Sequence, residues 1–416
     1  MTQPPSPTSS FRSTMVETLT SPQSYSLLMI YFTRHHFPLF LSTSFHKLIL
    51  PRLPVQLLVQ LRCLCKAWNS LITDLKFAKK QLSMSATPSN TLCLSYSNYS
   101  CKYYILKSYP LDSVFTNITS NVSKFEIIPT YFGDYLRFDP NCFIIGSCNG
   151  ILCIAKDSKD LVILWNPTIR KFRELPLLKK PQEFSHKYMQ FCLKPQTEFI
   201  FGYDSLTDNY KVIVVFNYNK SRGRWVNKIE LKLHTLGTNF WRSIKKFPFG
   251  VVPYDMSGKL VSGKFVGGAI NWLAFKPYPR TSCFIVAFDL GKESYQKVLL
   301  PNRGGVDVSG FSTLGVLRGC LSMTYSDDVW IMKEYGNTES WIKLFTISYV
   351  KDPRYCSAHP KAIYIFEDDQ VLLKCVGNFD FNYFVYDFRK GTIKPTNFQN
   401  ILEVYVESLI SPCSYC

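Results

Sequence analysis

The chain has 416 residues, of which 46% are hydrophobic and 15% aromatic, and its 48 Lys and Arg exceed its 30 Asp and Glu to give a net charge of +18. This hydrophobic fraction excludes a wholly disordered chain, and the many aromatic residues favour β structure. The basic residues are scattered and form no tail or Arg-rich stripe, which argues against a nucleic-acid-binding function and leaves acidic protein surfaces as fitting partners.

Residues 1–44 are predicted to form an N-terminal tail that is either disordered or aberrant. Residues 1–24 are rich in Ser, Thr and Pro and lack the charged start and apolar core of a signal peptide. The apolar stretch 25–42 is interrupted by Arg34, His35 and His36, so we expect no membrane span there. A diverged N-terminus and a wrong exon boundary both explain this composition. We expect the first 40 residues to be dispensable for stability.

The cysteines favour a reducing compartment. Several of the fourteen Cys lie inside apolar runs, including Cys148, Cys153, Cys283 and Cys375. A free buried Cys behaves as a small hydrophobic residue, and disulfides are rare in reducing compartments. We therefore expect a cytoplasmic or nuclear protein.

Residues 45–85 are predicted to form a helical pair. Pro54 suits the first turn of a helix, because the N–H that proline lacks would have no partner there. Apolar residues then recur at helical spacing, at Leu57, Leu58, Leu61, Leu64, Trp68, Leu71 and Ile72. A helix this apolar on so short a segment needs a partner surface, either on its own downstream domain or on another protein.

From about Leu92 onward the sequence changes to short β-strands separated by turn signals. Units of a Gly turn, two strands separated by a gap, a polar turn and a closing Leu-Pro recur along this region. Their spacing is roughly 43 to 55 residues, measured between Leu236, Phe288, Ile331 and Tyr386. One such sheet cannot bury both its faces, whereas a closed ring covers the faces and protects the strand edges. We predict a mainly β, kelch-like β-propeller of about six irregular blades over residues 90–412, with a stacked sandwich as the alternative.

Local signals within this region predict turns and core residues. Asn149-Gly150 is typical of a tight hairpin turn, and Asn166-Pro167 of a turn that ends a strand. Five tryptophans are expected to anchor the core: Trp165, Trp241, Trp272, Trp330 and Trp341.

The sequence offers no convincing catalytic, cofactor or metal site. Residues 258–265 match a phosphate-binding loop until the last position, where Phe265 replaces the Ser or Thr that would hold magnesium. Cys413 and Cys416 have Cys-x-x-Cys spacing without the second pair that a closed zinc site needs. Asp204 and Asp208 could form a carboxylate pair, but Asp between strands usually caps a turn. We predict a non-catalytic protein without cofactor or metal.

Two groups of motifs resemble known families. The segment 52–77 resembles the second half of an F-box, whereas the first half departs from that motif, with Ser42 in place of a proline and His46 in place of an isoleucine. Blocks at 146–153, 164–171, 201–212, 330–336, 339–341 and 406–412 resemble the F-box-associated interaction domain of plant F-box/kelch-repeat proteins. The implied organisation is an F-box at 45–85, with a degenerate N-terminal half, followed by the propeller at 90–412.

The resemblance implies the substrate-recognition subunit of an SCF-type cullin–RING ubiquitin ligase. The F-box would bind a Skp-type adaptor, and through it the cullin and RING subunits, while the propeller would bind a protein substrate. The implied adaptor-binding residues are Leu53, Pro54, Val55, Leu58, Leu61, Cys65, Lys66 and Trp68. The alternative is a stand-alone propeller binding module whose F-box does not function.

The propeller loops are expected to carry substrate specificity, because binding residues concentrate on loops held by a rigid scaffold. By length and composition the candidate recognition loops are residues 156–160, 179–190, 217–227 and 302–309.

Overall fold

The computed structural model describes residues 50–84, 91–99, 103–111, 142–156, 161–178, 196–218, 228–245, 247–248, 262–275, 283–302, 312–347, 360–376, 381–396 and 401–415. Met1–Thr87 and Ser408–Ile410 form one compact unit, which we call the helical unit, and Pro88–Glu407 with Ser411–Cys416 form the other, the propeller. The predicted tail at 1–44 and the first residues of the predicted F-box lie outside the described residues.

Short helices make up the described part of the helical unit. The 3₁₀ turn η2 (Leu50–Arg52) is followed by the helices α4 (Val55–Leu61), α5 (Lys66–Thr73) and α6 (Leu75–Met84). The predicted helical pair is thus wrong in number, because a turn at 62–64 breaks the apolar stripe between α4 and α5. Pro54 lies immediately before α4 as its N-cap, so it ends the preceding segment instead of occupying the first turn.

Asp74 explains why α5 and α6 are separate helices. Its backbone is extended, with φ −64° and ψ 133°, which interrupts the helical conformation. Its Oδ1 atom accepts a hydrogen bond of 3.0 Å from the backbone N–H of Phe77 and so caps the start of α6. No helix in the described part of the chain is long and apolar enough to cross a membrane.

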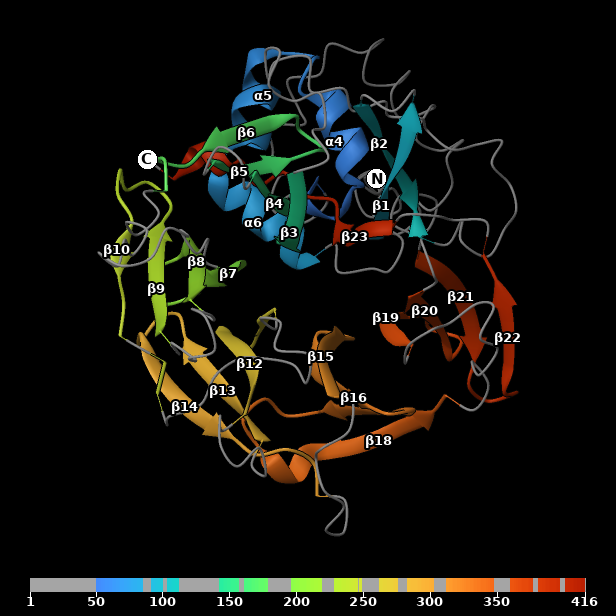
Figure 1. Cartoon of the computed structure of the whole chain (residues 1–416). Coiled ribbons are helices and arrows are strands. Elements are labelled where there is room, and N and C mark those ends of the chain that lie inside the picture. Colours follow the sequence, from blue (N-terminus) through green and yellow to red (C-terminus); the bar gives the residue numbers. More distant parts are fainter. Residues whose placement is uncertain are drawn as a thin grey trace, which may run out of the picture. The chain divides into compact units, whose positions relative to one another are not determined.

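The propeller consists of small antiparallel sheets arranged in a ring (Figure 1). The described residues form five four-stranded sheets and one three-stranded sheet. The four-stranded sheets contain β3 (Cys142–Cys148), β4 (Ile151–Lys156), β5 (Leu161–Asn166) and β6 (Lys171–Glu174); β7 (Gln196–Asp204), β8 (Asn209–Tyr218), β9 (Lys228–Thr235) and β10 (Arg242–Ser243); β11 (Lys264–Val266), β12 (Ala269–Phe275), β13 (Cys283–Asp289) and β14 (Ser294–Val298); β15 (Ser312–Leu317), β16 (Cys320–Tyr325), β17 (Asp328–Met332) and β18 (Trp341–Thr346); and β19 (Lys361–Ile365), β20 (Gln370–Val376), β21 (Phe381–Asp387) and β22 (Thr392–Pro395).

The three-stranded sheet closes the ring. It combines β1 (Thr91–Tyr99) and β2 (Tyr103–Pro110) from the start of the domain with β23 (Ile401–Val406) from its end, in the order β2-β1-β23. The β1 and β23 strands pair in antiparallel register, with Cys93 opposite Val404. The predicted mainly β propeller is confirmed, and a stacked sandwich is excluded. The prediction of about six kelch-like blades is corrected, because the described residues form five four-stranded sheets and a closing sheet of only three strands.

The hydrophobic core lies between neighbouring sheets. One buried cluster joins Ile213 and Leu231 of the β7–β10 sheet to Trp272 and Phe288 of the β11–β14 sheet. Two further clusters join β11–β14 to β15–β18, and β15–β18 to β19–β22. These four sheets therefore bury their faces against their neighbours in the ring, as the repeat predicted.

Tryptophans contribute to these interfaces in two ways. Of the five predicted anchors, Trp165, Trp272 and Trp341 are buried, while Trp241 and Trp330 are half-buried. The indole N–H of Trp241 donates to the carbonyl of Pro176 at 2.7 Å, and that of Trp341 to the carbonyl of Leu299 at 3.1 Å. Each acceptor follows the last strand of the preceding sheet, so the indole also links successive blades.

The predicted turns are present. Asn149 and Gly150 have φ values of 53° and 79°, as the tight β3–β4 hairpin requires. Asn166 ends β5, and its Oδ1 atom accepts from the backbone N–H of Thr168 at 2.9 Å. Among the predicted buried cysteines, Cys148, Cys153 and Cys375 are buried as free thiols, and Cys283 is half-buried.

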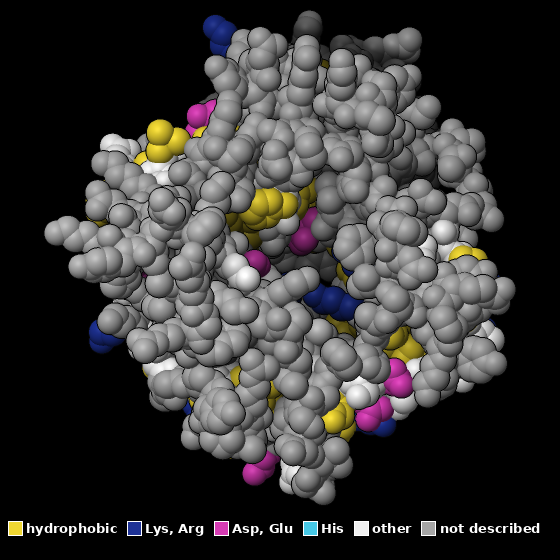
Figure 2. Space-filling view, in the orientation of Figure 1, with side chains coloured by type: hydrophobic (Ala, Val, Ile, Leu, Met, Phe, Trp, Pro, Cys, Tyr) yellow, Lys and Arg dark blue, Asp and Glu magenta, His cyan; other side chains and the backbone are white. Residues whose placement is uncertain are grey.

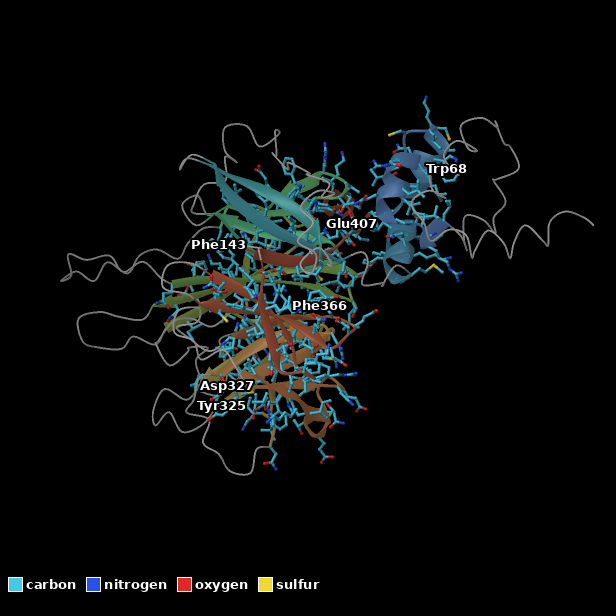
Figure 3. All side chains as sticks on the ribbon, turned by 90° about the vertical axis from the view of Figure 1, so that its right-hand side faces the viewer. Trp68, Phe143, Tyr325, Asp327, Phe366 and Glu407 are labelled. Carbon is cyan, nitrogen blue, oxygen red and sulfur yellow. The ribbon has the colours of Figure 1, made fainter. Side chains whose placement is uncertain are left out.

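The alternation of strand direction gives the propeller two different faces. The turns between first and second strands, and between third and fourth strands, lie on one face, which we call the turn face. The opposite connection face carries the starts of the first strands and the turns between second and third strands. Figure 3 shows Phe143, Tyr325 and Asp327 on the connection face and Phe366 and Glu407 on the turn face.

A glycine pair in the β11–β12 turn provides a test of this packing. Gly267 and Gly268 have φ values of 61° and 77°. A Cβ atom on Gly268 would meet nothing within 4 Å, whereas one on Gly267 would lie 2.5 Å from the ring of Tyr335 in the next blade. That ring is held by a 2.8 Å hydrogen bond from its hydroxyl to Asn271 Oδ1.

We expect Gly268→Ala to lower the free energy of unfolding by about 1 kcal/mol through backbone strain alone. Gly267→Ala should cost at least about 1 kcal/mol more, because the clash is added to the same strain. Urea denaturation of both variants measures the difference. Equal losses would show that Tyr335 does not pack on this turn.

Candidate partner-binding sites

The predicted adaptor-binding residues divide into a buried and an accessible group. Leu53, Val55, Leu58 and Leu61 are at most 3% exposed. Pro54 and Trp68 are half-buried, while Cys65 and Lys66 are exposed. Only the second group is available to a partner without rearrangement of the chain, so the first group supports the surface from beneath.

The corner between α4 and α5 gathers the accessible side chains. Leu64 lies in the turn at 62–64 and is 37% exposed, next to Cys65 and Lys66. The guanidinium Nε of Arg62 donates to Asn69 Oδ1 at 3.2 Å and so ties the turn to α5. We call Leu64, Cys65, Lys66 and Trp68 the corner patch. The helical period had placed Leu64 in a continuous stripe, and only the break after α4 reveals it as a surface residue.

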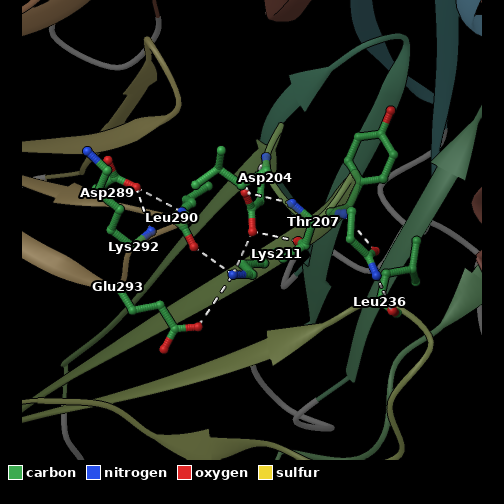
Figure 4. Close-up of polar contacts among 12 residues, drawn as sticks. Asp204, Thr207, Lys211, Leu236, Asp289, Leu290, Lys292 and Glu293 are labelled. Carbon is green, nitrogen blue, oxygen red and sulfur yellow. Dashed lines mark hydrogen bonds and ion pairs between the residues drawn. The ribbon is translucent and has the colours of Figure 1, made fainter.

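The predicted carboxylate pair does not form. Asp204 is 1% exposed and caps the β7–β8 turn, accepting from the backbone N–H of Leu206 at 2.9 Å and from the Thr207 hydroxyl at 2.5 Å (Figure 4). Asp208 is exposed, and the hydroxyl of Tyr203 donates to it. The prediction that Asp204 caps a turn is confirmed, and acid–base chemistry by these two carboxylates has no geometric basis.

Asp204 instead forms an ion pair with Lys211, and this pair links two neighbouring sheets of the propeller. Lys211, 4% exposed, places its Nζ atom 2.9 Å from Asp204 and 2.6 Å from the carbonyl of Leu290 in the next sheet (Figure 4). The same atom lies 3.4 Å from Glu293, which also pairs with Arg242. Burial alone would raise the pKa of Asp204, but the hydrogen bonds from Thr207 and Lys211 outweigh it and lower the pKa.

The remaining sequence candidates are described only in part. Lys264, within the loop-like segment 258–265, begins strand β11 instead of a helix, and residues 258–261 lie outside the described residues. Cys413 is exposed, with its Sγ atom 3.3 Å from the carbonyl of Phe172, and Cys416 lies outside the described part. Within the described ranges no three His, Cys, Asp or Glu side chains gather as metal ligands.

The central channel holds a charged cluster that the sequence reading missed. Seen along the channel, the propeller is hollowed at its centre, and Lys or Arg and Asp or Glu side chains are visible in the wall (Figure 2). Glu198, Lys264 and Lys361 come from β7, β11 and β19, the first strands of their sheets, and Glu403 comes from β23. All four side chains are half-buried. The only sequence signal was a charged residue near the start of each of these four strands, which becomes informative once the strands are known to surround one channel.

The charges in this cluster influence one another. Repulsion by Lys264, together with burial and Lys374, lowers the pKa of Lys361 to about 7. Burial raises the pKa of Glu403, although Lys264 and a hydrogen bond from Ser147 oppose the shift. Burial also raises the pKa of Glu198. The lysines of the channel therefore lie close enough to repel one another, and the carboxylates compensate their positive charge only in part.

The candidate recognition loops remain a prediction. Residues 156–160, 179–190, 217–227 and 302–309 lie almost entirely outside the described residues. The described strands that they join end and begin on the connection face, because these segments follow second or fourth strands.

Comparisons with known proteins identify the propeller domain and similar full-length proteins. Residues 102–412 match the model of the F-box associated beta propeller domain. The chain is 31% identical over 394 residues to the F-box/kelch-repeat protein At3g23880 of Arabidopsis thaliana, covering 92% of this chain and 97% of the relative. It is 27% identical over 385 residues to the F-box protein CPR1 of the same organism, covering 87% and 86% of the two chains.

The ion pair between the blades can be tested by substitution. We expect Lys211→Met to lower the free energy of unfolding by about 3 kcal/mol, because it leaves the Asp204 carboxylate buried without its counter-ion. The double variant Lys211→Met, Asp204→Asn should recover part of this loss, since an amide retains the cap without the charge. Urea denaturation at pH 7 checks both. If Lys211→Met were as stable as the wild type, the ion pair would not stabilise the fold.

The lowered pKa of Asp204 sets the pH dependence of the same pair. The carboxylate stabilises the wild type fully above its unfolded pKa, near 4, and this contribution is lost as the pH falls through the lower folded value. The advantage of the wild type over the double variant should therefore shrink in acid. Denaturation series from pH 7 to pH 3 measure it, and an advantage that grew in acid would assign the stabilisation to another group.

Proposed function

The chain belongs to the plant F-box proteins with an F-box-associated β-propeller domain, and on this basis we propose that it is the substrate-recognition subunit of an SCF-type cullin–RING ubiquitin ligase. The observation that carries the proposal is the combination of an accessible corner patch, in the turn before α5 and on α5 itself, with a propeller that offers a binding face of its own. Both are needed by a protein that brings two partners together.

In this proposal the helical unit binds a Skp-type adaptor through the corner patch. The exposed Leu64 and the half-buried Trp68 supply apolar contact area, and the exposed Lys66 supplies a charge beside them. An apolar centre with a polar rim is the usual organisation of a protein interface. The buried Leu53, Val55, Leu58 and Leu61 keep this surface in place.

The propeller holds the protein substrate, with the connection face as the binding surface. Ubiquitin transfer belongs to the cullin and RING side of the assembly, and this chain contributes proximity by holding the substrate near the transfer site. The chain itself is then a non-catalytic adaptor that works in the cytoplasm or nucleus without a cofactor.

The second candidate function is a stand-alone binding module that does not engage an adaptor. The observation that favours it is the departure of the first half of the F-box from the motif at Ser42 and His46, both outside the described residues. Adaptor binding distinguishes the two functions directly.

We expect Leu64→Asp to abolish capture of a purified Skp-type adaptor, because a charge replaces exposed apolar contact area without disturbing buried packing. Trp68→Ala should weaken binding by about 2 kcal/mol, some thirtyfold in affinity. Lys76→Ala, an exposed change on α6, is the control and should bind as the wild type does. Biolayer interferometry measures the affinities, and thermal melting confirms that each variant is folded.

The degenerate first half of the F-box supplies the deciding comparison. Ser42→Pro with His46→Ile should tighten the complex if that half limits binding. If neither the wild type nor this repaired chain captures the adaptor, the ligase proposal fails and the stand-alone module replaces it.

A further inference from the structure

Three lysines gather at the connection-face end of the channel. Lys264 and Lys361 are the first residues of β11 and β19, and first strands start at the connection face. Lys374 of β20 is the direct strand partner of Lys361, so it lies at the same level. Strand direction and register thus bring together positive charges that lie up to 110 residues apart in the sequence.

The carboxylates nearby do not form salt bridges with Lys264 or Lys361. Glu198 and Glu403 lie near the starts of β7 and β23, at the same end of the channel. Glu403 Oε1 accepts a hydrogen bond of 3.2 Å from the hydroxyl of Ser147. Within the described ranges no carboxylate oxygen lies within the 4.0 Å of a salt bridge from the amine of Lys264 or Lys361.

Repulsion among the lysines is unfavourable in the folded protein, and a negatively charged ligand would relieve it. The charge of Lys264 is the main cause of the lowered pKa of Lys361, to about 7, with burial and Lys374 adding to it and only Glu403 opposing it. Burial raises the pKa values of Glu198 and Glu403, which weakens their compensation. A bound anion would replace this repulsion by attraction, and charge-assisted hydrogen bonds from lysine amines are strong.

We propose that the connection-face end of the channel is an anion-binding site in which Lys264, Lys361 and Lys374 hold a phosphate, sulfate or carboxylate group. The group comes either from an acidic or phosphorylated segment of a bound protein or from a free small anion. The first source rests on the proposed substrate-binding function, and the second does not. The hollow at the centre of the propeller gives the ligand access (Figure 2).

The experiment uses the full chain and two probes at constant ionic strength. Sodium sulfate represents the small anion, with binding followed by calorimetry. A fluorescein-labelled hexaglutamate peptide represents the acidic segment, with binding followed by fluorescence anisotropy. We expect Lys361→Gln and Lys264→Gln each to weaken binding at least about tenfold, since each removes a charged donor. Lys292→Gln, which removes one charge from an exposed lysine on the turn face, is the control and should leave both affinities unchanged.

Thermal stability separates a binding role from a structural one. Lys361→Gln relieves repulsion from Lys264 and Lys374, so its melting temperature should equal or exceed that of the wild type while its anion affinity falls. A loss of both stability and binding would assign Lys361 a structural role and overturn the proposal.

The pH dependence gives an independent readout, because sulfate keeps its charge between pH 6 and pH 8. Lys361 gains a proton as the pH falls through about 7, so wild-type affinity for sulfate should rise over this range. The charged groups that act on Lys361 are Lys264, Lys374 and Glu403. Glu198 interacts in turn with Lys264. In Lys361→Gln the rise should be much smaller.

Binding of both probes, or of one, supports the site and identifies its source. Sulfate alone indicates a small anion, and the peptide alone indicates a protein segment. The proposal is overturned if the wild type binds neither probe, or if Lys361→Gln and Lys264→Gln bind as tightly as the Lys292→Gln control. Capture of the adaptor by the same preparations is measured separately, so failure of the anion site is distinct from failure of the ligase proposal.

Discussion

Pairing between β1 and β23 is the interaction on which the propeller depends. Every other sheet is made from consecutive strands, whereas this one joins strands whose paired residues, such as Cys93 and Val404, are separated by almost the whole domain. Without it the ring would have two open ends, each with an unpaired strand edge and an uncovered sheet face. Closure also fixes the first strands around one channel, so the charged cluster and the two faces of the ring are consequences of the same pairing.

Polar groups supplement the apolar packing between blades. The buried Lys211 reaches from Asp204 to the carbonyl of Leu290, and Trp241 and Trp341 donate to carbonyls of the preceding blade. Apolar surfaces alone tolerate small rotations between sheets, whereas these hydrogen bonds have a direction and leave a buried group unsatisfied if they break. These hydrogen bonds therefore restrain the angle between neighbouring sheets as well as the distance between them, and so hold the walls of the channel in place.

The parts of the fold that could be predicted from the sequence are those set by neighbouring residues. Asn149-Gly150 and Asn166 specify their turns through local backbone preferences, and the alternation of strands and turns indicated the propeller. The break between α4 and α5 could not be predicted, because Leu64 continues the helical period although it lies in a turn. The channel lysines were missed for a different reason: Lys264 and Lys361 are neighbours only after two blades have closed around the axis. Burial of Leu58 likewise depends on tertiary packing that a helical stripe does not reveal.

The helical unit is discontinuous in the sequence, and this has a consequence for synthesis of the protein. Ser408, Leu409 and Ile410 are at most 4% exposed and belong to the compact unit that begins at the other end of the chain. A nascent chain cannot complete this unit until residues 408–410 have left the ribosome, although its helices are translated first. A chain that stopped before Ile401 would lack both β23 and Ser408–Ile410, so its helical unit would be incomplete and its ring open. Loss of the end of the chain would therefore disturb both units of the protein at once.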